Sequence, residues 1–167
     1  MARAGSRRLP RQDREVKIDD DQFSAHYYQL AYMLSRFIVP MMRQTYREFG
    51  GDMLLTLVLG EIASRNLELF FGRGEPELPE SVLNDPRLQR SLLRPCNALS
   101  ISTATGIPRE TVRRRVKRLR DLGLIDQDGR GHLYVTQRTA DRFQRLTRST
   151  LEDLLPIAES LRALVRR

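Results

Sequence analysis

Apolar residues recur every three or four positions over three long stretches of the chain, and this spacing predicts amphipathic helices. The first stretch follows the acidic residues 19–21, which favour a helix start, and contains Pro40, which we expect to interrupt or kink it. Gly50 and Gly51 then break the chain, and Asp52 is placed to cap a second helix that is apolar on more than one side. A helix of that composition belongs in a core or an interface.

The third stretch starts after Thr136, a candidate helix cap, runs to Arg167, and contains Pro156, which we expect to kink or split it. Its apolar positions follow the alternating three- and four-residue steps of a heptad seam: Ala140, Phe143, Thr147, Thr150, Leu154, Ile157, Leu161 and Leu164. We predict that the terminal helices form a homodimer interface, which we favour over packing within one chain. The residues assigned to this interface are Phe23, Tyr27, Leu30, Leu34, Phe143, Leu154, Ile157, Leu161 and Leu164.

The chain between the long helices shows a shorter pattern. Residues 100–105 predict a short helix, after which Gly106 permits a sharp turn and Pro108 opens a new helix at its first position. Three apolar residues of this new helix recur at i, i+4 and i+7, so that one narrow face is buried. They are Val112, Val116 and Leu119.

The new helix ends near Gly123, a candidate left-handed cap, and two β-type runs follow at residues 124–126 and 133–136. Between the two runs, the pair Asp128-Gly129 is a strong hairpin signal. The predicted order of elements in this region is therefore helix, turn, helix and hairpin.

Positive charge is concentrated in a few segments. Residues 109–120 contain six Arg and one Lys against one Glu, a net charge of +6, while the whole chain of 167 residues carries +8. Residues 1–17 contribute +4 (six basic, two acidic) and residues 138–167 contribute +3 (seven Arg, four acidic), so the rest of the chain is negative. A charge run is usually a solvated helix face, but this partition favours a polyanionic partner for residues 109–120.

Three segments of this region resemble the DNA-binding domain of bacterial winged helix-turn-helix transcription regulators, as found in the MarR and GntR families. They are ATGIPRETVRRRVKRL at residues 104–119, DLGLI at residues 121–125 and DGRGHLYVT at residues 128–136. The resemblance spans residues 99–136, about 38 residues, and the helices on both sides favour a MarR-like plan. It implies a mainly α fold with a small β-hairpin wing, flanked by N- and C-terminal dimerisation helices.

The resemblance also implies where double-stranded DNA is contacted. Arg109, Glu110 and Arg113, near the start of the charged helix, are placed to read bases, because Arg donates to guanine and Glu accepts from cytosine. Arg130 lies at the hairpin tip, where it can reach the minor groove or its flanking phosphates, and His132 lies beside it. The full set, with Thr111, Arg114 and Lys117 on phosphates, is Ser102, Thr103, Pro108, Arg109, Glu110, Thr111, Arg113, Arg114, Lys117, Arg118, Arg130 and His132.

No motif in the sequence indicates catalysis. His26, His132 and Cys96 are the only histidines and cysteine, and they do not make a zinc site. The glycine-rich phosphate loops and the nucleophile motifs are absent. We therefore expect neither an enzyme nor a cofactor.

Two further features have competing interpretations. Cys96 follows Arg94, which would lower the thiol pKa and favour a reactive thiolate, but an isolated cysteine is more often a small buried apolar residue, the interpretation we favour. An aromatic and methionine group could line a pocket for a small-molecule effector, although core packing explains it more simply. This group comprises Tyr27, Tyr28, Met33, Met41, Met42 and Phe49.

Composition describes an ordinary soluble protein, with 40% apolar and 30% charged residues. The single cysteine favours a reducing cytoplasm, and the sequence has no 18-residue apolar run that would span a membrane. We expect a basic disordered arm at 1–18, helices of the core or dimer at 19–71, a loop and short helix at 72–95, the DNA-binding domain at 96–136, and a dimerisation helix at 137–167. The expected function is a homodimeric regulator reading an inverted-repeat operator. The alternative is a winged-helix module for protein or RNA interaction without sequence-specific DNA readout.

Overall fold

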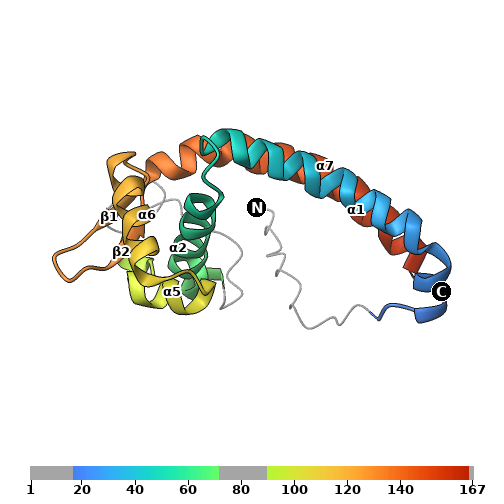
Figure 1. Cartoon of the computed structure of the whole chain (residues 1–167), viewed down its shortest axis with the longest axis horizontal. Coiled ribbons are helices and arrows are strands. Elements are labelled where there is room, and N and C mark those ends of the chain that lie inside the picture. The colour runs from blue at the N-terminus through green and yellow to red at the C-terminus, as the bar shows by residue number, and fades with distance from the viewer. Residues whose placement is uncertain (1–16, 72–89, 166–167) are drawn as a thin grey trace, which may run out of the picture. The chain divides into compact units, whose positions relative to one another are not determined.

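The computed structural model describes residues 17–71 and 90–165. The described chain is mainly helical and carries one small antiparallel hairpin, which confirms the fold class at that level (Figure 1). In order, the elements are α1 (Asp20–Glu48), α2 (Met53–Phe71), α5 (Ala98–Thr105), α6 (Arg109–Asp121), β1 (Ile125–Gln127), β2 (Leu133–Val135) and α7 (Gln137–Val165). The basic arm before residue 17 and most of the expected 72–95 loop and short helix lie outside the described residues, although residues 90–92 are helical.

The chain divides into two compact units. The hairpin unit comprises the described residues between 54 and 140, which are most of α2, then α5, α6, the β-hairpin and the start of α7. The helix-pair unit comprises the described residues up to 53 and from 141 onward, which are α1 and most of α7. The helix α2, which the sequence groups with α1, therefore belongs with the charged region.

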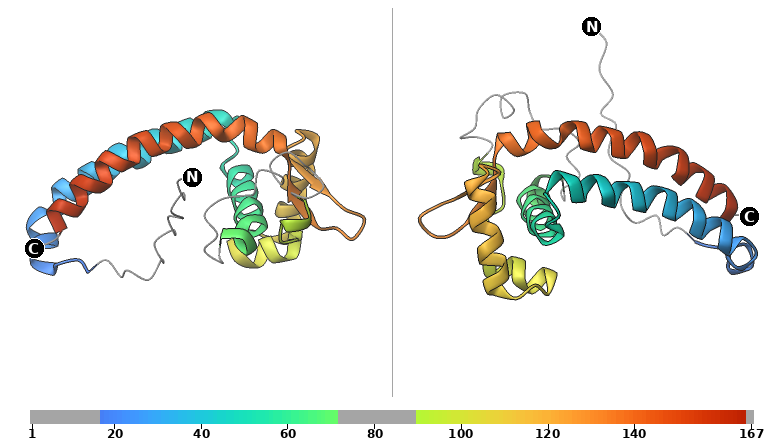
Figure 2. Two further views of the ribbon diagram at one scale, coloured as in Figure 1. Left: turned by 180° about the vertical axis from the view of Figure 1, so that it is seen from behind. Right: turned by 45° about the horizontal axis from the view of Figure 1, so that its top comes forward.

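In the helix-pair unit, α1 and α7 run antiparallel and side by side (Figures 1 and 2). At one end, the backbone N–H of Asp19 donates to the carbonyl of Val165 at 3.1 Å. At the other end, the Arg142 guanidinium donates to the Glu48 carboxylate at 2.7 Å and to the Glu48 carbonyl at 3.0 Å. The rings of Phe49 and Phe143 stack there with centroids 5.4 Å apart. Hydrogen bonds therefore join α1 and α7 near both ends of the pair.

Both long helices continue unbroken through an internal proline. Pro40 lies inside α1 and Pro156 lies inside α7, so neither proline interrupts or splits its helix, and a kink is the part of each expectation that an unbroken helix still allows. A proline removes one backbone donor, which is a small part of the hydrogen bonding of a 29-residue helix whose ends are fixed to its neighbour. The break at Gly50 and Gly51 is confirmed, with φ of 57° and 89°.

The residues directly before α1 and α7 have different roles at the starts of these helices. The Asp19 carboxylate caps α1 by accepting from the N–H groups of Asp21 and Gln22 at 3.1 and 3.0 Å. Thr136 directly precedes α7 as expected, but its hydroxyl donates to the carbonyls of Gly123 (2.8 Å) and Leu124 (3.2 Å). Because the hydroxyl is used in this way, Thr136 ties the start of α7 to the segment after α6.

The core of the hairpin unit joins α2, α5, α6 and both strands. The predicted narrow face of α6 is buried, with Val112, Val116 and Leu119 at 5% exposure or less. The other buried apolar side chains of this unit are Leu55, Val58, Leu59, Ile62, Cys96, Ile101, Ile107, Leu124, Ile125 and Leu133. This core holds the opposite side of α6 toward solvent.

Candidate nucleic-acid interface

The hairpin unit has a concave surface of about 680 Å³ between the start of α5, one side of α6 and the hairpin. We call it the basic hollow. Its lining is charged on α6 and mixed elsewhere, and consists of Asn97, Ala98, Leu99, Arg109, Glu110, Arg113, Arg114, Val116, Lys117, Arg120, Gln127, Arg130 and Gly131. Six of these residues are cationic at neutral pH and one is acidic, so the hollow has a strong positive potential.

Most of these cations are available to a ligand. Arg113 lies 3.9 Å from the Glu110 carboxylate, but both side chains are at least 65% exposed, so water screens this pair. Among the described residues, the structure shows no ion pair for Arg109, Arg114, Lys117 or Arg130. An anion bound by these four side chains would therefore not have to break an existing ion pair.

Two glycines set the ends of the helices that carry the hollow. Gly106 follows α5 at φ 70° and Gly123 follows α6 at φ 69°, both left-handed as predicted. Pro108 lies one residue before α6 and not at its first position, a one-residue correction to the expected start. The turn between α5 and α6 therefore consists of residues 106–108 only, which keeps the end of α5 next to the start of α6.

The row of residues facing the hollow follows from helical geometry. Arg109, Arg113 and Lys117 recur every four positions, so at 100° per residue they form a row along one side of α6, about 60° to 140° around the helix from the buried Val112. Arg115 and Arg118 project on another side of the helix and do not line the hollow; both take part in other interactions. The charged helix therefore carries cations that line the hollow and two further arginines, Arg115 and Arg118, that do not.

Half of the twelve predicted DNA-contacting residues meet in the hollow: Arg109, Glu110, Arg113, Arg114, Lys117 and Arg130. Ser102, Thr103, Pro108, Thr111, Arg118 and His132 are outside its lining. The hydroxyls of Ser102 and Thr103 donate instead to the carbonyls of Ile107 (2.7 Å) and Leu99 (3.0 Å). Ser102 thus stabilises the turn after α5, and Thr103 bonds to the backbone of α5 itself. Residue type alone does not predict these roles.

The hollow also contains residues that the sequence did not single out. Asn97 caps α5, accepting from the N–H groups of Leu99 and Ser100 at 3.0 Å, while Ser100 reaches back to the Asn97 N–H. The Asn-x-x-Ser spacing at residues 97–100 is the sequence signal that could have predicted this helix cap. Arg120 donates to the side-chain oxygen of Gln127 at 2.9 Å, which links the end of α6 to β1. No local pattern predicts that link, because it depends on how the hairpin folds back.

The hairpin itself has the predicted position, with strands paired Ile125 to Val135 and Gln127 to Leu133. Its tip is organised by Asp128, whose carboxylate accepts from the N–H groups of Arg130 and His132 at 2.9 Å. The His132 ring nitrogen Nδ1 lies 3.1 Å from the same carboxylate. The backbone hydrogen bond from His132, joined by that from Arg130, lowers the pKa of Asp128 below its ordinary value.

The two glycines of the tip are not equivalent. Gly131 has φ of 83° and closes the turn by donating to the Asp128 carbonyl at 3.0 Å, as in a type I turn followed by a left-handed residue. Gly129 does not have a positive φ, so the left-handed conformation at this tip is confined to Gly131. His132 is turned to Asp128 at the base of this tip.

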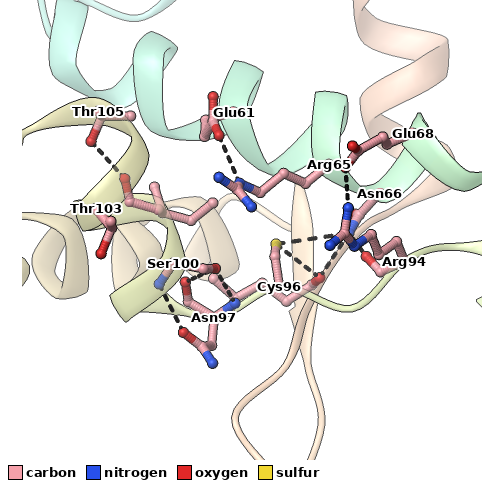
Figure 3. Close-up of polar contacts among 12 residues, drawn as sticks. Glu61, Arg65, Asn66, Glu68, Arg94, Cys96, Asn97, Ser100, Thr103 and Thr105 are labelled. Atoms are coloured by element: carbon pink, nitrogen blue, oxygen red, sulfur yellow. Dashed lines mark hydrogen bonds and ion pairs between the residues drawn. The ribbon is translucent and has the colours of Figure 1, made fainter. Parts of the chain in front are cut away.

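A buried amide fixes the hairpin to α2 (Figure 3). The side-chain nitrogen of Asn66 donates to the carbonyls of Arg94 (2.8 Å) and Leu133 (3.1 Å), and its oxygen accepts from the Val135 N–H at 2.8 Å. Asn66 is 0% exposed, and a short bridge pairs Cys96 with Leu133 beside it. Arg94 also pairs with Glu68 on α2. One side chain thus joins α2, the segment before α5, and β2.

Cys96 belongs to this buried network. Its Sγ lies 3.8 Å from the Asn66 amide nitrogen and 3.7 Å from the Leu133 carbonyl. Burial raises the pKa of the Cys96 thiol from 9.0 to about 11, which outweighs the opposing effect of Arg65. The interpretation of Cys96 as a small buried residue is therefore confirmed, and its surroundings favour the neutral thiol over the thiolate.

Comparisons of the chain with protein-family models, with curated protein sequences and with solved structures find no match. In residues 17–71 and 90–165, no helix is long and apolar enough to cross a lipid bilayer. The same residues contain no group of three or more His, Cys, Asp or Glu side chains arranged to hold a metal ion.

Proposed function

We propose that the protein is a transcription regulator of the MarR-like bacterial type, acting in the cytoplasm, which binds double-stranded DNA in a sequence-specific manner. In this proposal α5, α6 and the β-hairpin form a winged helix-turn-helix. The observation that carries it is the basic hollow, where six cations and one carboxylate line a concave surface between a helix and a hairpin. A duplex supplies the closely spaced phosphates that such a surface can neutralise.

The form of α6 supports DNA over other polyanions. A single α-helix fits the major groove of B-DNA, and α6 is 13 residues long with its apolar side held by the core. Glu110 and Arg113 lie one turn apart on its exposed side. An acceptor beside a donor permits discrimination of cytosine from guanine, which a purely cationic surface does not offer.

The alternative, a module for protein or RNA interaction, has weaker support. A protein-binding surface would be built on apolar side chains, and the hollow offers Leu99 as its one exposed large apolar residue among the described residues. Double-stranded RNA has a deep, narrow major groove that helix side chains do not read. The acid–base arrangement on α6 therefore fits duplex DNA better.

Selection from a pool of random DNA duplexes tests the proposal. The full chain should enrich a consensus and bind it at least about 10³-fold more tightly than an unselected duplex at physiological salt. Affinity for both should fall as salt rises, because bound phosphates release counterions. Binding without enrichment, or equal binding to duplex RNA of the same length, would contradict sequence-specific DNA recognition.

A further inference from the structure

A chain of side-chain hydrogen bonds runs from the end of α6 to the tip of the hairpin. The Arg120 guanidinium donates to the side-chain oxygen of Gln127 at 2.9 Å, and the side-chain nitrogen of Gln127 donates to the Gly131 carbonyl at 3.2 Å. Gln127 is the last residue of β1, and all three residues line the basic hollow together with Arg130. One amide therefore connects the charged helix with the turn that carries Arg130.

The orientation of the Gln127 amide is fixed by its two partners. An arginine side chain has donors only, and a backbone carbonyl only accepts. The amide oxygen must therefore face Arg120 and the amide nitrogen must face Gly131, because the reverse orientation would place donor against donor and acceptor against acceptor. Gln127 thus uses both ends of its amide at once, which neither a carboxylate nor a hydrocarbon of the same size can do.

The turn around Arg130 is held internally by hydrogen bonds of its own. The Asp128 carboxylate accepts from the Arg130 N–H at 2.9 Å, and the Asp128 carbonyl accepts from the Gly131 N–H at 3.0 Å. These bonds fix the shape of the tip but not its distance from α6. The strands are three residues long, and an isolated hairpin of two strands is only marginally stable in water. The position of the tip relative to α6 therefore depends on contacts such as the one through Gln127.

Arg130 is the side chain that this arrangement presents to a ligand. It is exposed, and the structure shows no ion pair for it among the described residues. Its backbone N–H is bonded to Asp128, and both the N–H and the carbonyl of the next residue, Gly131, are bonded as well. A cation on a backbone held in this way loses less conformational freedom on binding than one on a free loop.

We propose that Gln127 is a positioning residue for DNA recognition, which holds Arg130 at a set distance from the row of cations on α6. With α6 in the major groove, Arg130 enters the minor groove beside the half-site. A narrow minor groove, as in A·T tracts, has an enhanced negative potential that attracts arginine. The duplex recognised therefore carries an A·T-rich flank beside the bases that α6 reads. This inference rests on the proposed function and adds to it the DNA flank and the residue that aligns Arg130 with it.

Two duplexes test this role of Gln127. Both contain the half-site selected by the full chain, and they differ in whether the base pairs that flank it are A·T or G·C. In titrations at one salt concentration, the parent should bind the A·T-flanked duplex at least about fivefold more tightly. Gln127→Leu removes both hydrogen bonds, and Gln127→Glu removes the donor to Gly131 only. Each should reduce the flank preference to about twofold or less, because one hydrogen bond contributes a factor of about 2–10 to an equilibrium constant.

Asp126→Asn is the matched control on the same strand. Asp126 directly precedes Gln127, so strand alternation places its side chain on the other side of the hairpin. There its carboxylate lies 3.9 Å from the Arg90 guanidinium, and it does not line the hollow. The Asp126→Asn variant should keep the flank preference of the parent. A loss as large as that in the Gln127 variants would show that any change in the strand moves the tip, against a specific role of Gln127.

A double variant separates positioning of Arg130 from a general effect on the hairpin. Because Gln127 acts through Arg130, Gln127→Leu should not change the flank preference further once Arg130→Ala is present. A parent without flank preference, or Gln127 variants that weaken both duplexes equally and so keep the preference, would overturn this inference while the proposed function stands. If selection enriches no consensus at all, the proposed function and this inference fail together.

Discussion

At the scale of single residues, Arg113 is the most informative side chain of the hollow. It lies in the middle of the basic row of α6, is 65% exposed, and has an acidic neighbour in Glu110. If it donates to a base, Arg113→Ala should cost about 1–3 kcal/mol on the selected duplex and relax preference at one base position. Titration of labelled duplexes carrying each base at that position would measure the change.

Arg118→Ala is the matched control for Arg113→Ala. It removes the same charge from the same helix, but on a side that does not line the hollow. It should weaken selected and random duplexes alike, by a small factor that falls with salt. If Arg118→Ala lowers sequence preference as much as Arg113→Ala, the hollow is not the reading surface and α6 docks through its other basic side.

Asn66 is the residue on which the stability of the hairpin unit depends most. Asn66→Ala would leave the Val135 N–H and the carbonyls of Arg94 and Leu133 without this partner in a closed core. A buried unsatisfied group costs about 1–3 kcal/mol, so we expect the free energy of unfolding to fall by about 2–4 kcal/mol. Urea denaturation measures this free energy. The control is Ser64→Ala, at an exposed position on the same helix. A loss below about 0.5 kcal/mol would show that the Asn66 amide is dispensable.

The contrast between α6 and Asn66 shows what could be predicted at this scale. The hollow-facing row of α6 follows from local helical spacing, because the buried Val112, Val116 and Leu119 determine which side remains exposed. Asn66 contacts residues 28 and 67 positions away, so no nearby spacing marks it. The same holds for Cys96, whose pKa follows from burial and not from its neighbour Arg94.

At the scale of elements, the predictions succeeded where a signal lies inside the element. Gly106 and Gly123 end their helices with positive φ, and the hairpin forms within a residue of the expected positions. They were only partly right where tertiary contacts override a local signal. Pro40 and Pro156 are strong helix breakers in isolation, yet each lies inside an unbroken helix that is fixed to its neighbour at both ends.

The hairpin tip offers a prediction at this scale, because its two glycines differ. Gly131 has φ of 83°, so Gly131→Ala should strain the backbone by about 1 kcal/mol although no atom lies within 3.4 Å of the new Cβ. Gly129 has neither a positive φ nor a neighbour within 4 Å, so Gly129→Ala should be tolerated. Because Arg130 lies between them, Gly131→Ala should also reduce affinity for the selected duplex, by about fivefold if the strain is released on unbinding.

Duplex titration and urea denaturation of both glycine variants check this prediction. The selected base preference should stay unchanged in each variant, since α6 is not altered. If Gly129→Ala and Gly131→Ala reduce affinity equally, the effect comes from side-chain bulk at the tip and not from the left-handed turn.

At the scale of the whole molecule, the pairing of α1 with α7 joins segments more than 90 residues apart in sequence, as in the hydrogen bond between Arg142 and Glu48. Heptad spacing indicated that α7 packs on another helix, but spacing does not specify which helix or which chain. The structure divides the apolar positions into a half-buried set between α1 and α7 and an exposed set that includes Ile38, Met42, Leu151 and Leu155. Periodicity alone merged these two sets into one predicted interface.

If two copies of the chain associate as the predicted homodimer, the complex has a two-fold axis. DNA has the same local symmetry, so the selected consensus should be an inverted repeat whose half-sites are about 34 Å, or one helical turn, or a multiple of it, apart. A duplex with one half-site scrambled should lose at least about 100-fold in affinity, because only one subunit is then engaged specifically. Insertion of about 5 base pairs between the half-sites should have a similar effect, since it turns one half-site to the opposite face of the DNA. Quantitative footprinting on these three duplexes measures both losses. Tight binding of one chain to one half-site would contradict the symmetric arrangement and would leave the dimer with a role outside DNA recognition.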